Sequence, residues 1–221
     1  MANTALIIGS SGSGKSTSIR TLDPKTTFII SVLDKPLPFK GFKKLYKPIS
    51  GWDDTEGNYF VSDDWSRIVK CIQMVDKRRP DITTIILDDW QYILSHEFMK
   101  RSSERGFDKF SDMAFHGWST MTAMNNTRDT LTGFILAHND TDSVGVSTLK
   151  TVGKLLSEKI TIEGIFSTCL HTRVIDGRFC FQTQHDGDRM ARSPMGMFDD
   201  SLIDNDLQYV KDKIESYFNE E

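Results

Sequence analysis

The sequence predicts an α/β protein whose mostly parallel β-sheet carries helices on both faces. Short runs of apolar, β-branched residues alternate with longer segments of helical spacing, which is typical of parallel strands joined by helices. Asp176-Gly177 separates two alternating segments, residues 164–175 and 178–184, and predicts an antiparallel hairpin at one edge of the sheet. A chain of 221 residues has the length of one such domain, and we expect a single domain over residues 1–221.

The expected elements follow one another along the chain. The segment after Ser62 shows helical spacing of apolar residues, with Ser62 as its expected cap and Pro80 as its stop. We expect buried strands at residues 4–8, 26–32, 82–87 and 133–138. We expect helices at residues 62–79, 90–99, 113–131 and 151–159, and an acidic amphipathic helix at about 204–221. A loop rich in Ser, Thr and Gly is expected at residues 140–148.

A glycine-rich motif follows the first strand. Gly9, Gly14, Lys15 and Ser16 fill the fixed positions of G-x-x-x-x-G-K-[ST], the P-loop pattern, between a strand and a helical pattern. In such a loop the glycines let successive N–H groups point at one phosphate, and the helix start adds the positive end of its dipole. The lysine bridges the outer phosphates, and the Ser hydroxyl holds magnesium. We therefore expect ATP and Mg²⁺ to bind at Gly9, Ser10, Ser11, Gly12, Ser13, Gly14, Lys15, Ser16 and Thr17.

Two adjacent carboxylates end the third expected strand, in the segment TTIILDD. A carboxylate at the carboxyl end of a neighbouring buried strand completes the magnesium site of P-loop proteins, and Asp88 occupies that place. Asp89 is the candidate for the residue that activates the attacking water. The alternative for Asp89 is that its side chain only caps the helix that begins at Trp90.

Three further residues are candidates for catalysis. His138 ends the next strand, in FILAHND, where a polar side chain can sense the γ-phosphate and pass its loss to the following loop. A structural role is the alternative for this histidine. Arg189 and Arg192, in GDRMARSP, are candidates for the charge that meets the transferring phosphoryl group, in the same subunit or from a neighbour. An exposed basic loop is the alternative for both arginines.

Two segments have the composition of a nucleic-acid contact. Residues 35–47 contain five lysines interleaved with three aromatic residues and no acid, as in surfaces that follow a nucleic-acid backbone and stack bases. A solvated lysine-rich loop is the favoured interpretation of this segment, because acidic residues follow closely after it. The second segment is the loop after His138, where residues 143–154 carry Lys150 and Lys154 and no acid.

The overall composition restricts the possible classes of protein. A net charge of -4 and a pI near 5.8 give no global attraction to nucleic acid, so any DNA binding would depend on local patches. No apolar run approaches the ~20 residues of a membrane span, and the amino terminus lacks the pattern of a signal peptide. We therefore expect a cytoplasmic protein with no membrane partner. The three cysteines show no metal-binding spacing and are expected to be reduced, buried thiols.

With these motifs in place, the chain resembles the small RecA-like ATPases of tailed phages, the Sak-type single-strand annealing proteins of the AAA family. The matching segments span nearly the whole chain. They are the P-loop near residue 9, LDDWQYIL at 87–94, ILAHND at 135–140, KLLSEKITIEGIFSTCL at 154–170 and FQTQHDGDRMARSPMGMF at 181–198. The last two are long enough to make the resemblance more specific than the P-loop alone, which many unrelated functions share.

The resemblance implies a RecA-like core, magnesium-dependent ATP hydrolysis and single-stranded-DNA binding, in phage recombination or replication beside a single-strand-binding protein. By the same comparison, Lys150 and Lys154 lie on the DNA-facing loop, and Arg192 is the basic residue near the γ-phosphate. RecA-like ATPases often place their site between subunits, so a homo-oligomer in a ring or filament is expected, in the cytoplasm of the host bacterium. The sequence departs from the family in one respect. Asp88-Asp89 comes without an obvious catalytic glutamate, which leaves the water-activating base open.

Two other functions are compatible with the P-loop. A nucleoside or nucleotide kinase has this length, but such kinases usually carry an arginine-rich lid and an acceptor-binding DR motif, whereas here Arg189 and Arg192 stand alone. A non-catalytic nucleotide switch or packaging accessory factor would bind ATP without turnover. Phosphate release that needs no acceptor and is stimulated by DNA would distinguish the DNA-dependent ATPase from the kinase and from the switch.

Overall fold

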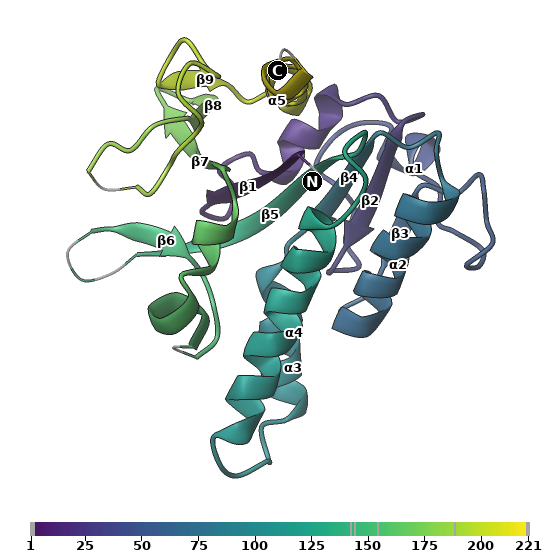
Figure 1. Cartoon of the computed structure of the whole chain (residues 1–221), viewed down its shortest axis with the longest axis vertical. Coiled ribbons are helices and arrows are strands. Elements are labelled where there is room, and N and C mark those ends of the chain that lie inside the picture. Colours follow the sequence, from purple (N-terminus) through teal and green to yellow (C-terminus); the bar gives the residue numbers. More distant parts are fainter. Residues whose placement is uncertain (1–2, 142, 144, 154, 188, 220–221) are drawn as a thin grey trace.

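A mixed, mostly parallel β-sheet forms the centre of the molecule (Figure 1). The structure, a computed structural model, describes residues 3–141, 143, 145–153, 155–187 and 189–219. Its strands are β1 (Asn3–Gly9), β2 (Thr27–Ser31), β3 (Tyr59–Val61), β4 (Thr84–Asp88), β5 (Thr132–Thr141), β6 (Ser147–Leu149), β7 (Thr168–Ile175), β8 (Arg178–Gln182) and β9 (Leu202–Asp204). They lie in the order β3-β2-β4-β5-β1-β7-β8-β9, with β6 paired to the end of β5. The strands from β3 to β7 in this order are parallel, whereas β8 and β9 continue the sheet by antiparallel pairing.

Helices cover both faces of the sheet, which explains why the central strands are continuous apolar runs. One face packs against α2 (Trp65–Arg78), α3 (Gln91–Lys100) and α4 (Asp108–Asn125). The other packs against the 3₁₀ helix η1 (Ser16–Thr21), the short α1 (Phe42–Leu45) and α5 (Leu207–Asn219). The expected α/β class, the mostly parallel sheet and the helices on both faces are therefore confirmed.

The expected α-helix after the glycine motif was wrong. The chain forms only the six-residue 3₁₀ helix η1, which ends at Leu22, where the N–H bonds the carbonyl of Ile19. Asp23-Pro24 follows at once, and a residue before proline is disfavoured in helical conformation. The helix that the sequence pattern indicated after the motif is therefore a short 3₁₀ helix of six residues.

Two other helices have different ends from those expected. The cap of α2 is Asp64 and not Ser62, since the Asp64 carboxylate accepts the N–H groups of Ser66 and Arg67. Helix α4 lies several residues earlier than the expected range 113–131. It stops at Asn125 because the chain then turns so that the Arg128 guanidinium can bind backbone carbonyls at the end of α2 and the start of β4.

The segments after β5 also differ from the expectation. Part of the expected loop 140–148 is a hairpin, in which β6 pairs with the last three residues of β5. The expected helix at 151–159 is a π-helix, η2 (Leu155–Ile160), and a 3₁₀ helix, η3 (Ile162–Ile165), follows it. The β7–β8 hairpin forms as expected around Asp176-Gly177, but β9 pairs outside β8 and makes the edge.

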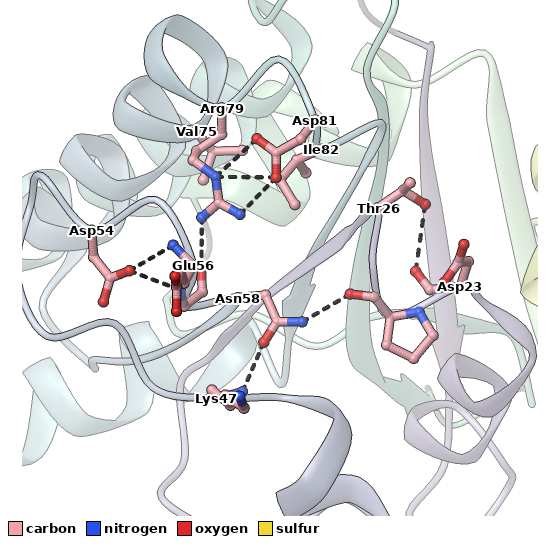
Figure 2. A network of polar contacts seen from close by, with 12 residues as sticks. Asp23, Thr26, Lys47, Asp54, Glu56, Asn58, Val75, Arg79, Asp81 and Ile82 are labelled. Carbon is pink, nitrogen blue, oxygen red and sulfur yellow. Dashed lines mark hydrogen bonds and ion pairs between the residues drawn. The ribbon is translucent and has the colours of Figure 1, made fainter.

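A polar network fixes the lysine-rich segment 35–47 to the body of the protein (Figure 2). The buried Asn58 side chain accepts the N–H of Lys47 and donates to the carbonyls of Pro24 and Leu45. Nearby, the Arg79 guanidinium pairs with Asp81 and donates to a backbone carbonyl of the loop before β3. This segment is therefore held in place on its inner side.

The aromatic residues of segment 35–47 contribute to the core. Phe42 and Tyr46 are buried and pack together, and Phe42 also contacts Tyr59 of β3. The five lysines of the segment are exposed. The idea of lysines alternating with base-stacking rings was therefore wrong, because these two rings point into the protein.

We expect Asn58→Ala to destabilise the protein by about 2 kcal/mol, because three partly buried backbone groups lose their hydrogen-bond partner. Urea denaturation would measure this loss. The matched control is Asn126→Ala, at an exposed position. Equal unfolding free energies for the two variants would contradict the anchoring role of Asn58.

Candidate functional site

The candidate site is built on the loop of residues 9–16, here called the glycine loop, which joins β1 to η1. Gly12 and Gly14 have φ values of +74° and +98°, a region that other residues rarely adopt. Gly9 is required for a different reason. A Cβ on Gly9 would lie 1.7 Å from the Thr172 Oγ1 of β7, so only glycine lets the loop pass this close to the sheet.

Residues from the carboxyl-terminal half of the chain hold the glycine loop in place. The Ser13 and Thr172 hydroxyls are hydrogen-bonded at 2.6 Å. The buried Asn205 amide donates to the Gly14 carbonyl at 3.3 Å and accepts from Arg20 at 3.1 Å. Contacts between residues so distant in sequence fix the shape of the loop.

Lys15 is buried and turned back onto its own loop. Its Nζ donates to the carbonyls of Gly9 at 2.7 Å and Ser10 at 2.9 Å. Burial lowers the pKa of Lys15 to about 8, against the opposing effect of the charges of Asp89 and Asp88. The ammonium group therefore lies at the loop with neutral carbonyls as its only hydrogen-bond partners within the described residues.

Ser16 joins the glycine loop to the end of β4. Its Oγ donates to Asp88 Oδ1 at 2.9 Å, across 72 positions of sequence. Asp88 is fully buried, and burial together with the neighbouring charge of Asp89 raises its pKa. The two residues that the sequence assigned to a metal site, 72 positions apart, are thus in direct contact.

Asp89 lies between Lys35 and His138, which come from the two strands that flank β4 or the segment just after one of them. Its Oδ2 forms an ion pair with Lys35 Nζ at 2.5 Å, after β2, and its Oδ1 lies 3.5 Å from His138 Nε2, on β5. Burial raises the pKa of Asp89, but His138 and Lys35 outweigh this effect and hold the pKa below its usual value. Its φ of +64° is strained for an aspartate. The helix-capping alternative is wrong, because the cap residue of α3 is Trp90 and the Asp89 side chain contacts Lys35 and His138.

The donor set fits a small, hard cation such as Mg²⁺. Asp88 Oδ2 is a buried carboxylate oxygen with no hydrogen-bond partner in the described part of the chain, beside the hydroxyl of Ser16. Among the same described residues, no group of three or more His, Cys, Asp or Glu is placed to hold a metal. One carboxylate and one hydroxyl suit magnesium, which is usually bound by few protein groups together with phosphates and water.

Strand β5 connects the site to the hairpin that carries Lys150. The Ser10 hydroxyl donates to Asn139 Oδ1 at 3.0 Å, and Asn139 Nδ2 donates to the Ser147 hydroxyl of β6 at 2.8 Å. The Lys150 N–H bonds the His138 carbonyl at 2.9 Å, and the Lys150 side chain is exposed. Lys154, the other candidate DNA contact, lies outside the described residues.

Arg192 does not join the candidate site. Its guanidinium donates to the carbonyls of Glu163 and Phe166, before the amino-terminal end of β7, whereas the glycine loop follows the carboxyl end of the parallel strand β1. Arg192 also forms a backbone bridge with Cys169. In this conformation it ties the chain to the sheet, so its expected place beside the phosphates of its own subunit is corrected, whereas a role at the site of a neighbouring subunit stays a prediction. Arg189 is paired with Asp186 at 3.2 Å.

Several site residues were not expected from the sequence. Lys35, Gln91 and Asn139 contact Asp89, the His138 N–H and Ser10 respectively. Lys35 follows β2, Gln91 opens the helix after β4, and Asn139 is the residue after the parallel-paired part of β5, so position near a strand end is the only sequence signal that could have found them.

No family model matches the sequence, and no curated protein does. Among the described helices, none has the length and apolar character needed to cross a membrane.

Strand β7 carries a buried histidine, His171, which pairs in register with Ile8 of β1 just before the glycine loop. His171 is 1% exposed, and its Nε2 has no hydrogen-bond partner within the described residues. Burial lowers its pKa to about 4, and the charge of Arg189 acts in the same direction, against that of Asp186. The folded protein therefore keeps His171 neutral at pH values where an unfolded histidine is protonated.

We expect Gly9→Ala to destabilise the protein by about 2 kcal/mol or more, since the new methyl group collides with Thr172. Unfolding in urea measures this, with Gly51→Ala as control, because a Cβ at Gly51 meets nothing within 4 Å. The double variant Gly9→Ala/Thr172→Ala should recover part of the loss. No recovery would show that Thr172 is not what restricts position 9.

We expect the free energy of unfolding to fall as the pH drops from about 6.5 to about 4, because only the unfolded state takes up the proton of His171 over this range. At ~1.4 kcal/mol per pKa unit, the loss from this group is on the order of 2–3 kcal/mol. Above pH 6.5 the group is neutral in both states and has no effect. His171→Gln should flatten this slope in urea denaturation, whereas the exposed-site control His185→Gln should not. Equal slopes in all three proteins would contradict the assignment.

Proposed function

We propose that this protein is a magnesium-dependent ATPase that binds single-stranded DNA, a RecA-like recombination or annealing protein of the phage type. The observation that carries the proposal is the 2.9 Å contact between Ser16 Oγ and Asp88 Oδ1. A hydroxyl from a glycine loop that meets a buried strand-end carboxylate is the metal-binding pair that phosphoryl-transfer sites of P-loop proteins require.

The nucleotide part of the proposal assigns a role to each residue at the site. Lys15 binds the outer phosphates after it leaves the carbonyls of Gly9 and Ser10. Ser16 and Asp88 would hold Mg²⁺, which supplies positive charge to the phosphate oxygens. Asp89 accepts the proton of the attacking water.

His138 links hydrolysis to the hairpin in this proposal. Its imidazole is close to Asp89, and its carbonyl accepts the N–H of Lys150. A change at the γ-phosphate that moves His138 would therefore reach the hairpin through one residue.

The DNA part of the proposal rests on the resemblance and on this connection. The exposed Lys150 ammonium would bind DNA phosphates, with Lys154 as a second contact. Such contacts are electrostatic, so the affinity falls as salt rises. A homo-oligomeric ring or filament, and a single-strand-binding protein as partner in the host cytoplasm, belong to the same proposal.

The test is phosphate release from ATP with magnesium, with and without single-stranded DNA. We expect DNA to stimulate turnover in the wild type, and we expect Lys15→Ala and Asp88→Asn to lower kcat by about 100-fold or more. Lys15→Ala removes a positive charge from the transferring phosphate, and Asp88→Asn removes the carboxylate that would hold Mg²⁺. Lys25→Ala, at an exposed lysine outside the site, is the control.

Two outcomes would reject parts of the proposal. ATP turnover that DNA does not change, with phosphate transferred to an added nucleoside, would indicate a kinase. ATP binding without turnover would indicate a nucleotide switch. DNA affinity that is the same with and without ATP, and unchanged in Lys150→Ala/Lys154→Ala, would remove the proposed role of the hairpin.

A further inference from the structure

Lys35 is a second lysine at the candidate nucleotide site, and it comes from outside the glycine loop. It follows β2, and its ammonium is 2.5 Å from Asp89, beside the buried Asp88. Its side chain is 45% exposed, whereas that of Asp89 is 2% exposed. The ammonium group can therefore move on its flexible stem, while the carboxylate is fixed.

The charges of the site extend to Lys35. The main cause of the lowered pKa of Lys15 is burial, and the positive charge of Lys35 is a minor cause in the same direction. The two ammonium groups therefore lie within electrostatic reach of each other. Asp88 and Asp89 face these two lysines. An incoming polyphosphate brings several negative charges into this cluster and competes with Asp89 for Lys35.

The arginines of the segment 183–192 have partners elsewhere. Arg192 is bound to the carbonyls of Glu163 and Phe166, and Arg189 pairs with Asp186. Phosphoryl transfer is accelerated by a cation that meets the charge on the transferring group, in addition to the lysine of the loop. Lys35 is the exposed cation that already lies at the carboxylate pair.

We propose that Lys35 contacts the terminal phosphate of bound ATP. On ATP binding its ammonium leaves the ion pair with Asp89 and pairs with that phosphate instead. This inference rests on the proposed function and adds a catalytic residue to it. In this arrangement Asp89 Oδ2 pairs with the Lys35 ammonium, and Asp89 Oδ1 lies 3.5 Å from His138 Nε2. Departure of Lys35 frees Oδ2 for the attacking water.

The chemical step then balances within the site. The oxygen of water forms a bond to the γ-phosphorus, and the bond from that phosphorus to the bridging oxygen breaks. The electron pair of the broken bond stays on ADP, and the proton of the water goes to Asp89 Oδ2. Lys35 stays with the transferred phosphoryl group and neutralises part of its charge.

The experiment compares the affinities for ATP and ADP by titration calorimetry, without DNA. Lys35→Ala should weaken ATP binding by about 10-fold or more, as expected for one lost charged contact, and leave ADP binding within about 2-fold. Lys35→Arg should restore most of the ATP affinity. Lys40→Ala is the matched control, an exposed lysine of the same segment.

Asp89 provides the second half of the test. Asp89→Asn removes the competing carboxylate, so ATP should bind at least as tightly as in the wild type while hydrolysis is lost. Lys35→Ala/Asp89→Asn does not leave the Asp89 carboxylate buried without Lys35, so it should stay folded if Lys35→Ala alone does not. The double variant should keep the preferential loss of ATP affinity.

Three results would overturn the inference. They are equal losses of ATP and ADP affinity, unchanged ATP affinity in the double variant relative to Asp89→Asn, and faster hydrolysis in Lys35→Ala, which would make Lys35 an inhibitory clamp. A wild-type protein that does not bind ATP would instead reject the proposed function itself. The two failures are therefore distinguishable.

Discussion

The candidate site depends on the position of β5 between β1 and β4. The strand that leads into the glycine loop and the strand that ends in the carboxylates are not neighbours, so Ser16 reaches Asp88 across the end of β5. Parallel strands bring their carboxyl ends to one edge of the sheet, and His138 therefore lies where this contact crosses. The same strand continues past His138 into the hairpin. Because of this strand order, His138 lies both beside the carboxylates and at the start of the β5–β6 hairpin.

Charge balance is the second constraint on the site. Two adjacent carboxylates with little exposure to water repel each other and would be unfavourable without nearby cations. Lys15 lies near the pair, whereas Lys35 and His138 come from separate strands and face Asp89 directly. The positive φ of Asp89 indicates that this arrangement is maintained at a cost in backbone strain, on the order of 1–3 kcal/mol. Strain of this kind is expected where several elements fix one side chain for function.

The sequence predicted the parts of the site that depend on local order. The fixed spacing from Gly9 to Ser16 and the strand-end position of Asp88 were sufficient to predict their meeting, because buried parallel strands align their ends. Lys35 was missed because its segment shows no periodicity, and lysine-rich composition says nothing about which lysine turns inward. Arg192 was misplaced for the same reason. The path of the chain after β8 has no repeating apolar pattern, and its position is set by tertiary hydrogen bonds to carbonyls before β7. The hairpin turn at Asp176-Gly177 was predictable, since its left-handed backbone is a local property of those residues.

The support of the glycine loop explains why residues near both ends of the chain are needed for one site. The loop lies against Thr172 of β7, Phe179 of β8 and Asn205 after β9, and two of its glycines are required by these contacts. These contacts join side chains and backbone of the protein itself, so under the proposed function they hold the loop in shape for a phosphate. What would have to move on binding is then limited to side chains, above all Lys15 and Lys35, which have neutral carbonyls and a carboxylate as their partners. In that proposal the terminal phosphate would select the active arrangement, because a ligand with that phosphate could replace both sets of partners at once.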